Sequence, residues 1–197
     1  LGIAERLGAF FSGLVPDLPD EIDIKVAGEI GGYDTKIIAL AALRGILNKH
    51  SNHPITFVNA FEHAERLGVQ IRDFGSQDAG EFRNLIEVRA SDHAVAGTLV
   101  RSGNEPRIVM IDDYSVEVPL SSHILVIRND DRPGMMGIVG TLLGKADVNI
   151  SFMALGRDGA GDHALMALAS DQPIAEDVLE TLKSEVGIQS ASLIELG

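Results

Sequence analysis

The stretch Asn129-Asp130-Asp131-Arg132-Pro133-Gly134 decides the fold of the second half of this chain. It follows an apolar run at 123–128 that is typical of a buried strand, and it precedes a run at 135–143 with apolar residues at helical spacing. Pro133 suits the first turn of a helix, where its missing N–H leaves no hydrogen bond unmade. Asp131 is therefore predicted just before a helix N-terminus, where free N–H groups and the helix dipole favour an anion. An amino acid could place its carboxylate at that N-terminus and its ammonium beside Asp131.

Working outward from this stretch, the sequence after residue 122 predicts a compact α+β unit. The predicted strands cover 123–129, 150–157, 163–170 and 188–196, and the predicted helices cover 133–146 and a run that opens at Pro173. The order βαββαβ is that of the ferredoxin-like fold. Right-handed crossovers would place both helices on one face of an antiparallel sheet.

The preceding part of the chain starts with helical patterns and then becomes rich in strands. Helices are predicted over 3–14, 35–47 and 59–68, and strands over 22–26, 69–74, 82–90, 94–100, 107–111 and 116–118. A turn at Ser102-Gly103-Asn104 separates two of these strands. Because 119–122 is the expected linker, we predict a mixed α/β domain at 1–120 and a second domain at 121–197.

Composition and charge exclude several classes of protein. The chain has 197 residues, is 45% hydrophobic and carries a formal net charge of −13, so we expect no nucleic-acid or membrane partner. It has no Cys, which fits a cytoplasmic protein. No apolar run has the length of a membrane span. Glu5 and Arg6 interrupt the start in a way that signal peptides do not, and Met is missing there, so we expect a piece of a longer protein.

The stretch 129–134, with Asp147-Val148-Asn149-Ile150 downstream, resembles an ACT domain, a small module that senses amino acids. The segment before it resembles the allosteric substrate-binding domain of bacterial D-3-phosphoglycerate dehydrogenase. The second resemblance is carried by Leu7-Gly8, Gly28-Glu29, Leu43-Arg44-Gly45, Val58-Asn59-Ala60, Gly97-Thr98 and 107–112. It implies that the chain is the C-terminal regulatory region of such an enzyme, which oxidises 3-phosphoglycerate with NAD at the start of L-serine synthesis.

The resemblance also implies an effector site. In ACT domains that sense serine, the loop after the first strand and the Asn that opens the second strand bind the effector, and the matching residues here are Asn129, Asp131 and Asn149. From the residues alone, turn formation and helix capping remain an alternative use of these side chains. Relatives carry other polar or aromatic residues where Asn129 stands. The implied partners are L-serine or a similar small amino acid, and further copies of the chain in a homodimer or homotetramer paired through ACT domains.

Arg107 is the candidate for a second, anion-binding site. It matches a basic position of the upstream domain, where basic residues of relatives are implicated in binding phosphate or a phosphorylated acid. The alternative is an ordinary solvated Arg at the end of a strand. The sequence departs from the family pattern at Phe61 and at Asp113.

No catalytic, cofactor-binding or metal-binding residue is predicted in this chain. A Gly-x-Gly-x-x-Gly motif between a strand and a helix is missing, so no dinucleotide site is predicted here. The resemblance implies that NAD binds an upstream region of the parent enzyme. His50 and His53 lack a third ligand nearby for zinc.

Two alternative functions remain for the chain. One is a free-standing amino-acid sensor. The other is the regulatory part of an iron–sulfur L-serine dehydratase, whose cluster would need Cys from elsewhere.

Overall fold

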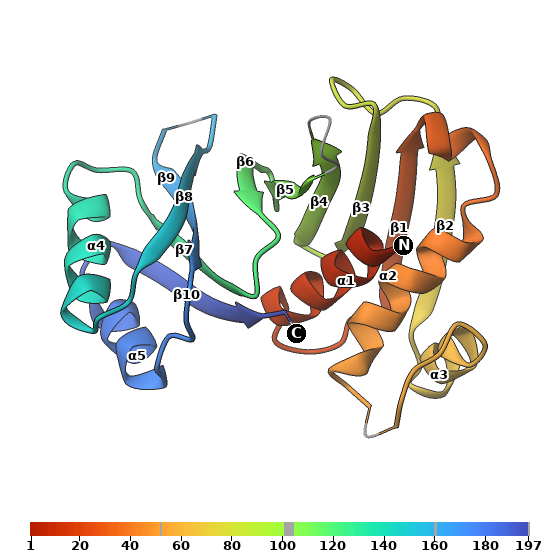
Figure 1. The fold of residues 1–197 in the computed structure, drawn as a ribbon, viewed down its shortest axis with the longest axis horizontal. Coiled ribbons are helices and arrows are strands. Elements are labelled where there is room, and N and C mark those ends of the chain that lie inside the picture. The colour runs from red at the N-terminus through yellow and green to blue at the C-terminus, as the bar shows by residue number, and fades with distance from the viewer. Residues whose placement is uncertain (52, 101–104, 160, 197) are drawn as a thin grey trace. The chain divides into compact units, whose positions relative to one another are not determined.

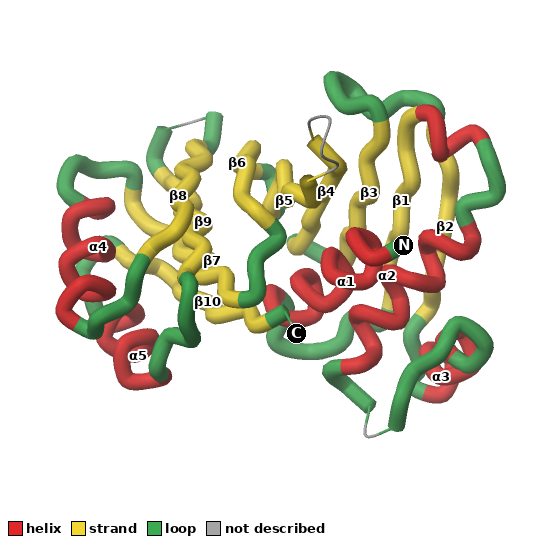
Figure 2. The backbone as a smooth tube through the Cα atoms, viewed as in Figure 1, coloured by secondary structure: helices red, strands yellow, loops and turns green. Residues whose placement is uncertain are grey.

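In the computed structural model, the chain forms two compact units, Leu1–Asp112 and Asp113–Gly197. The structure describes residues 1–51, 53–100, 105–159 and 161–196 (Figures 1 and 2). The predicted α+β class, with a mixed α/β unit followed by a βαββαβ unit, is confirmed. The expected boundary after residue 120 falls one strand later than the division between the units, and the predicted turn at Ser102-Gly103-Asn104 lies outside the described residues.

Helices cover a mixed sheet in the first unit. Its strands are hydrogen-bonded in the order β2-β1-β3-β4-β5, and β1 pairs with β2 in parallel and with β3 antiparallel. Gly31-Gly32 lies at the end of a short 3-10 helix, η1. The elements are α1 (Gly2–Leu14), β1 (Glu21–Gly28), η1 (Glu29–Gly32), α2 (Lys36–Asn48), α3 (Ala60–Arg66), β2 (Gln70–Ser76), β3 (Asn84–Ala90), β4 (His93–Val100) and β5 (Glu105–Ile111).

Two glycines allow α1 and α2 to pack with their backbones in contact. A Cβ atom on Gly45 would overlap the carbonyl oxygen of Glu5 and lie 2.8 Å from the amide nitrogen of Ala9. A Cβ on Gly8 would meet the backbone of Ala42 in the same way. Because real Cβ atoms do not approach backbone so closely, only glycine fits at these two positions.

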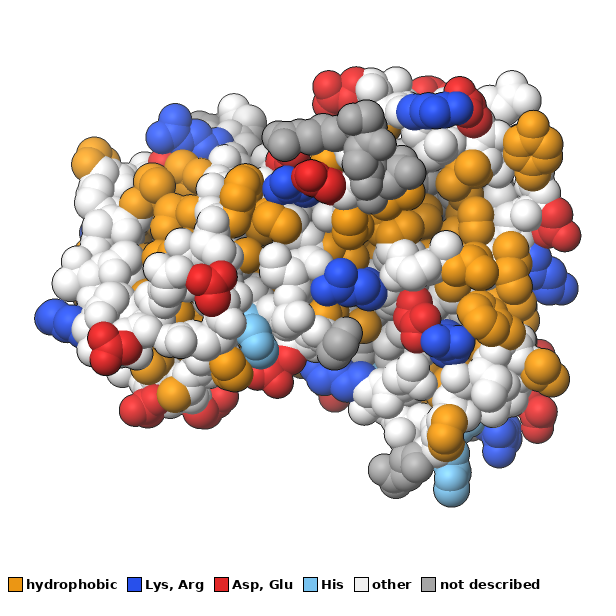
Figure 3. Space-filling model, in the orientation of Figure 1, with side chains coloured by type: hydrophobic (Ala, Val, Ile, Leu, Met, Phe, Trp, Pro, Cys, Tyr) orange, Lys and Arg blue, Asp and Glu red, His pale blue; other side chains and the backbone are white. Residues whose placement is uncertain are grey.

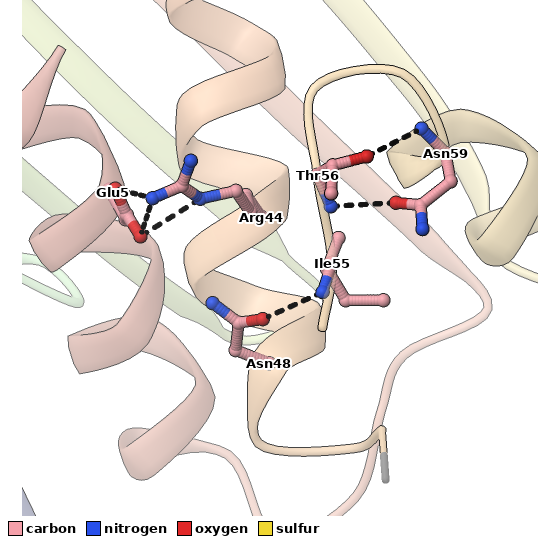
Figure 4. A network of polar contacts seen from close by, with 6 residues as sticks. All are labelled: Glu5, Arg44, Asn48, Ile55, Thr56 and Asn59. Carbon is pink, nitrogen blue, oxygen red and sulfur yellow. Dashed lines mark hydrogen bonds and ion pairs between the residues drawn. The ribbon is translucent and has the colours of Figure 1, made fainter. Parts of the chain in front are cut away.

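Polar contacts reinforce the crossing of the two helices (Figure 4). Arg44 donates from Nε and Nη2 to the carboxylate of Glu5 at 2.6 to 3.0 Å, and its guanidinium lies 4.8 Å from the ring centroid of Phe57. Arginine in such a geometry combines charge-assisted hydrogen bonds with a cation–π contact. Further along, the Asn48 side chain accepts a hydrogen bond from the backbone N–H of Ile55 at 3.3 Å. These contacts tie α1, α2 and the segment that leads to α3 together.

His50 should make the stability of the first unit depend on pH. Burial lowers the pKa of the His50 imidazole below its ordinary value, and the charge of Lys49 acts in the same direction while Asp17 opposes it. Its Nε2 lies 3.0 Å from Oγ of Ser12. In the unfolded chain a histidine titrates near pH 6.5, so its stabilising contribution is complete above about 6.5 and declines as the pH falls through the lowered pKa.

Urea unfolding between pH 5 and 8 checks this expectation, with the unfolding followed at amides of α1 and α2. The free energy of unfolding of the wild type should decline toward pH 5 more steeply than that of His50→Gln, which cannot take up the proton. Equal slopes in the two proteins would contradict the assignment.

The second unit contains the predicted βαββαβ fold, preceded by one strand. Its sheet has the order β10-β7-β9-β8 and is antiparallel throughout. Both helices pack on the same face, where Leu125, Met166, Leu143 and Leu182 belong to one buried cluster (Figure 1). The elements are β6 (Tyr114–Pro119), β7 (His123–Asp130), α4 (Met135–Lys145), β8 (Ile150–Arg157), β9 (His163–Ser170), α5 (Glu176–Ser184) and β10 (Ile188–Glu195).

Both helices of this unit begin later than the sequence predicts. Pro133 lies in the turn before α4, and Gly134 precedes the helix in the left-handed region with φ +94°. Likewise Pro173 precedes α5, because Ala175 is still extended with ψ 149°. In both places a proline marks the approach to a helix rather than its first turn.

The surface carries its charge in scattered positions. On the face shown in Figure 3, acidic and basic side chains are dispersed over each unit, and several lie side by side. Within the described residues, no helix combines the length and the apolar character that a membrane span requires.

Candidate functional site

The N-terminus of α4 opens onto the helix-covered face of the second sheet. Among the described residues no side chain caps this N-terminus, and the first turn contains no acidic residue. The free N–H groups of the first turn, together with the helix dipole, make this end of the helix attractive to an anion. Gly134 reaches its positive φ without strain, which allows the chain to turn sharply from β7 into the helix.

A pocket of about 330 Å³ lies at this helix end. Strand register explains its composition. Asn129, Ala164 and Arg157 occupy one row across β7, β9 and β8, and Ile127, Met166 and Leu155 occupy the next row on the same face. The pocket therefore has a polar end and an apolar wall. Its lining residues are Asn129, Asp131, Arg132, Pro133, Gly134, Met135, Met136, Leu155, Arg157 and Met166.

Asn129 supplies a buried polar group with unused hydrogen-bonding capacity. Its exposed fraction is 1%, and its Nδ2 donates to the carbonyl oxygen of Asp130 at 2.7 Å. Its Oδ1 accepts no hydrogen bond from any residue that the structure describes. A buried carbonyl oxygen without a donor costs about 1–3 kcal/mol, so this atom indicates a place for a ligand donor.

Asp131 supplies the negative charge of the pocket. Its side chain is only 18% exposed, and its Oδ2 lies 2.9 Å from Nε of Arg157, whose own side chain is 65% exposed. The backbone N–H of Asp131 donates to the carbonyl oxygen of Asp162 at 3.0 Å, which holds the residue in place. The carboxylate is thus the fixed partner and the guanidinium the exposed one.

Arg157 belongs to the site but was missed by sequence reasoning. The predicted hairpin of 150–157 with 163–170 could have pointed to this residue. Its register pairs Arg157 with Ala164, and Ala164 pairs with Asn129 on the next strand. That inference needs the exact register, which the sequence did not provide.

Arg132 lines the pocket but binds elsewhere in the unit. Its Nη2 donates to the carbonyl oxygen of Val186, and its Nε lies 3.3 Å from Sδ of Met135. Gly187, with φ +94°, leaves room for the guanidinium, since a Cβ there would lie 2.9 Å from Cζ of Arg132. Arg132 therefore anchors the loop to the segment before β10.

Asn149 lies away from this pocket, at the opposite end of β8 from Arg157. Its Nδ2 donates to Oδ2 of Asp171 at 2.5 Å. Within one chain, the structure brings Asn129 and Asp131 together and leaves Asn149 apart. The role predicted for all three residues stays a prediction.

Arg107 lies on β5, opposite Thr98 of β4. Its side chain is 12% exposed, and its Nη2 donates to Oε2 of Glu105 at 3.1 Å. It is thus more buried than an ordinary solvated Arg at a strand end. Anion binding by Arg107 stays a prediction.

Each unit contains a match to a known protein family. Residues 1–112 match the D-3-phosphoglycerate dehydrogenase intervening domain, and residues 123–187 match the ACT domain. The chain belongs to the D-3-phosphoglycerate dehydrogenase family. Both resemblances predicted from the sequence are thereby confirmed.

Curated relatives agree with this membership. The D-3-phosphoglycerate dehydrogenases of Mycobacterium leprae, Archaeoglobus fulgidus and Synechocystis sp. are 32%, 30% and 27% identical to the chain. Each alignment covers 100% of this chain but only 38%, 38% and 36% of the respective relative. The chain thus spans little more than a third of the length of these relatives, and the pocket described above lies within the residues that match the ACT domain.

Proposed function

We propose that the ACT domain binds L-serine or a similar small amino acid, and that the chain is the regulatory region of an NAD-dependent D-3-phosphoglycerate dehydrogenase. The observation that carries the binding proposal is the buried Oδ1 of Asn129, which has no donor among the described residues and shares its pocket with Asp131. Membership in the dehydrogenase family supports the regulatory role.

The charges of the pocket match those of an amino acid. The carboxylate of Asp131 and the Oδ1 of Asn129 would accept hydrogen bonds from the ligand's ammonium. The N–H groups at the start of α4 would donate to its carboxylate, as helix N-termini do for other anions. The apolar wall at Leu155 and Met166 would exclude water from the two charge contacts and so strengthen them.

Titration of the 197-residue chain with L-serine tests this proposal. Calorimetry should show binding, and NMR should show shifts of the Asn129 side-chain amide and of the backbone amides of 135–137. N-acetyl-L-serine lacks the ammonium and L-serinamide lacks the carboxylate, so both should bind far more weakly. If no amino acid binds, or if the shifts lie outside the pocket, the proposal fails.

The geometry of β8 would allow Asn149 to contribute to the site of a second copy of the chain. β8 is an edge strand, and edge strands are commonly covered by pairing. If two copies paired antiparallel through β8 about a twofold axis, the start of one strand would lie beside the end of the other. Asn149 of the partner subunit would then stand next to the Arg157 end of the pocket. We therefore propose that a complete site needs two ACT domains.

Serine should then stabilise the dimer. A ligand that binds only the dimer stabilises it by about 2.7 kcal/mol per site at a hundredfold excess over its dissociation constant. Sedimentation should show a lower dimer dissociation constant with L-serine than without it, and Asn149→Ala should reduce the difference. If the dissociation constant does not change although calorimetry confirms binding, each site lies within one chain.

A further inference from the structure

We infer that Arg157 makes the ACT pocket selective for α-amino acids whose side chain carries an anionic group, such as a carboxylate or a phosphate. This inference rests on the proposed function, because it concerns the amino-acid site itself. The inference concerns Arg157 at the end of β8, which has no role in the proposed serine complex.

The carboxylate of Asp131 lies between two positive groups of the pocket, the guanidinium of Arg157 and the N-terminus of α4. The third positive group, Arg132, is bound to the carbonyl oxygen of Val186. Asp131 contacts Arg157 through the 2.9 Å ion pair, and three residues later Gly134 precedes the uncapped N-terminus of α4. Arg157 reaches the carboxylate from the far side of β9, because β9 separates β8 from β7 in the sheet. The order is therefore guanidinium, carboxylate, helix N-terminus.

An amino acid that binds by its ammonium must compete with Arg157 for Asp131. The backbone of Arg157 is held by pairing with Ala164, but its side chain is 65% exposed and can turn while remaining at the pocket wall. L-serine would leave the displaced guanidinium without an anionic partner, because its single carboxylate is taken by the helix N-terminus. A second anionic group on the ligand would restore the lost ion pair.

The guanidinium is suited to this task. Its planar fork donates two parallel hydrogen bonds to a carboxylate or a phosphate, and such charge-assisted bonds are stronger than neutral ones. The pocket of about 330 Å³ lies at the small end of the range of about 300–1,000 Å³ for ligand pockets. It therefore suits a single amino acid with an acidic side chain better than a nucleotide-sized anion.

Calorimetric titrations of the 197-residue chain test the inference with L-serine, L-aspartate and O-phospho-L-serine as probes. At least one of the two acidic amino acids should bind the wild type about tenfold or more tightly than L-serine, and their ranking identifies the preferred anion. Arg157→Gln should weaken the acidic ligands roughly tenfold to a hundredfold, the range typical of a charged hydrogen bond, and leave L-serine binding equal or tighter. Arg157→Lys keeps the positive charge but loses the planar fork, so its affinity for the acidic ligands should lie between those of the wild type and Arg157→Gln.

Lys183→Gln is the matched control, because it removes one positive charge from the same unit. Lys183 pairs with Glu180 at 2.8 Å on α5 and does not line the pocket, so this variant should bind all three probes like the wild type. Selectivity by Arg157 is rejected if the acidic amino acids bind no better than L-serine, or if Arg157→Gln weakens the three probes equally. In both cases L-serine still binds, so the proposed function survives. If none of the three probes binds, the proposed function fails and the selectivity fails with it.

Discussion

Replacing Asp131 with Ala should weaken L-serine binding to the ACT domain by roughly tenfold to a hundredfold. The ammonium would lose a charge-assisted hydrogen bond worth about 1.5–3 kcal/mol. In addition, the variant leaves Arg157 without its partner at 2.9 Å, so a positive charge stays in the pocket and repels the ammonium. Calorimetry with L-serine measures the change, and far-ultraviolet circular dichroism should show an unaltered fold.

Asp130→Ala provides the control for this experiment. Asp130 is the next carboxylate along the chain, but strand alternation turns it to the other face of the sheet, where its Oδ1 accepts a hydrogen bond from Gln189 at 3.2 Å. The control variant should bind L-serine within a factor of two or three of the wild type, as expected for a group that does not touch the ligand. Equal affinities of the Asp131→Ala variant and the wild type would remove Asp131 from the site.

Gly45→Ala should destabilise the intervening domain by about 1–3 kcal/mol, the usual cost of overpacking a tight interface. The added Cβ would overlap the carbonyl oxygen of Glu5, and neither helix backbone can give way without separating α1 from α2. Helix propensity acts in the opposite direction, since Ala is favoured over Gly by about 1 kcal/mol at an exposed helix position. We expect the overlap to dominate, and hydrogen exchange of amides in α1 and α2 measures the net effect.

Gly140→Ala in α4 separates these two contributions. Nothing lies within 4 Å of a Cβ built on Gly140, so only the propensity term applies there. This variant should stabilise the ACT domain by up to about 1 kcal/mol, with the opposite sign to Gly45→Ala. A stabilised Gly45→Ala protein would mean that α1 and α2 are not in backbone contact in solution.

The sequence predicted most of the fold because the apolar spacing is regular in most elements. The helix around Phe10 and the strands of the second unit have clear periods, and each was found within a few residues of its true bounds. The helix starts at Pro133 and Pro173 were less accurate, because proline fits both the first turn of a helix and the approach to it. The backbone contact at Gly45 could not be foreseen, because it depends on which helix faces which.

The candidate site was predictable only in part for a related reason. Asn129 and Asp131 are close in sequence to the helix start, so local pattern was enough to place them together. Arg157 enters the pocket through strand register, which depends on long-range pairing and not on local spacing. The separation of Asn149 from Arg157 follows from the extended geometry of β8, whose bounds of 150–157 the sequence predicted.

The extended form of β8 also limits how this region can change in length. From Phe152 to Arg157 the register with β9 is regular and the side chains alternate between faces, so an insertion or deletion of one residue there would turn the residues on one side of it to the wrong face. A change of two residues would keep the faces but alter the separation of the two ends. The hairpin loop after Arg157 carries no such restriction, so we expect length variation among relatives to be tolerated there and rejected inside the strand. If Arg157 and Asn149 have the roles proposed above, the number of residues between them in β8 is fixed by the binding site.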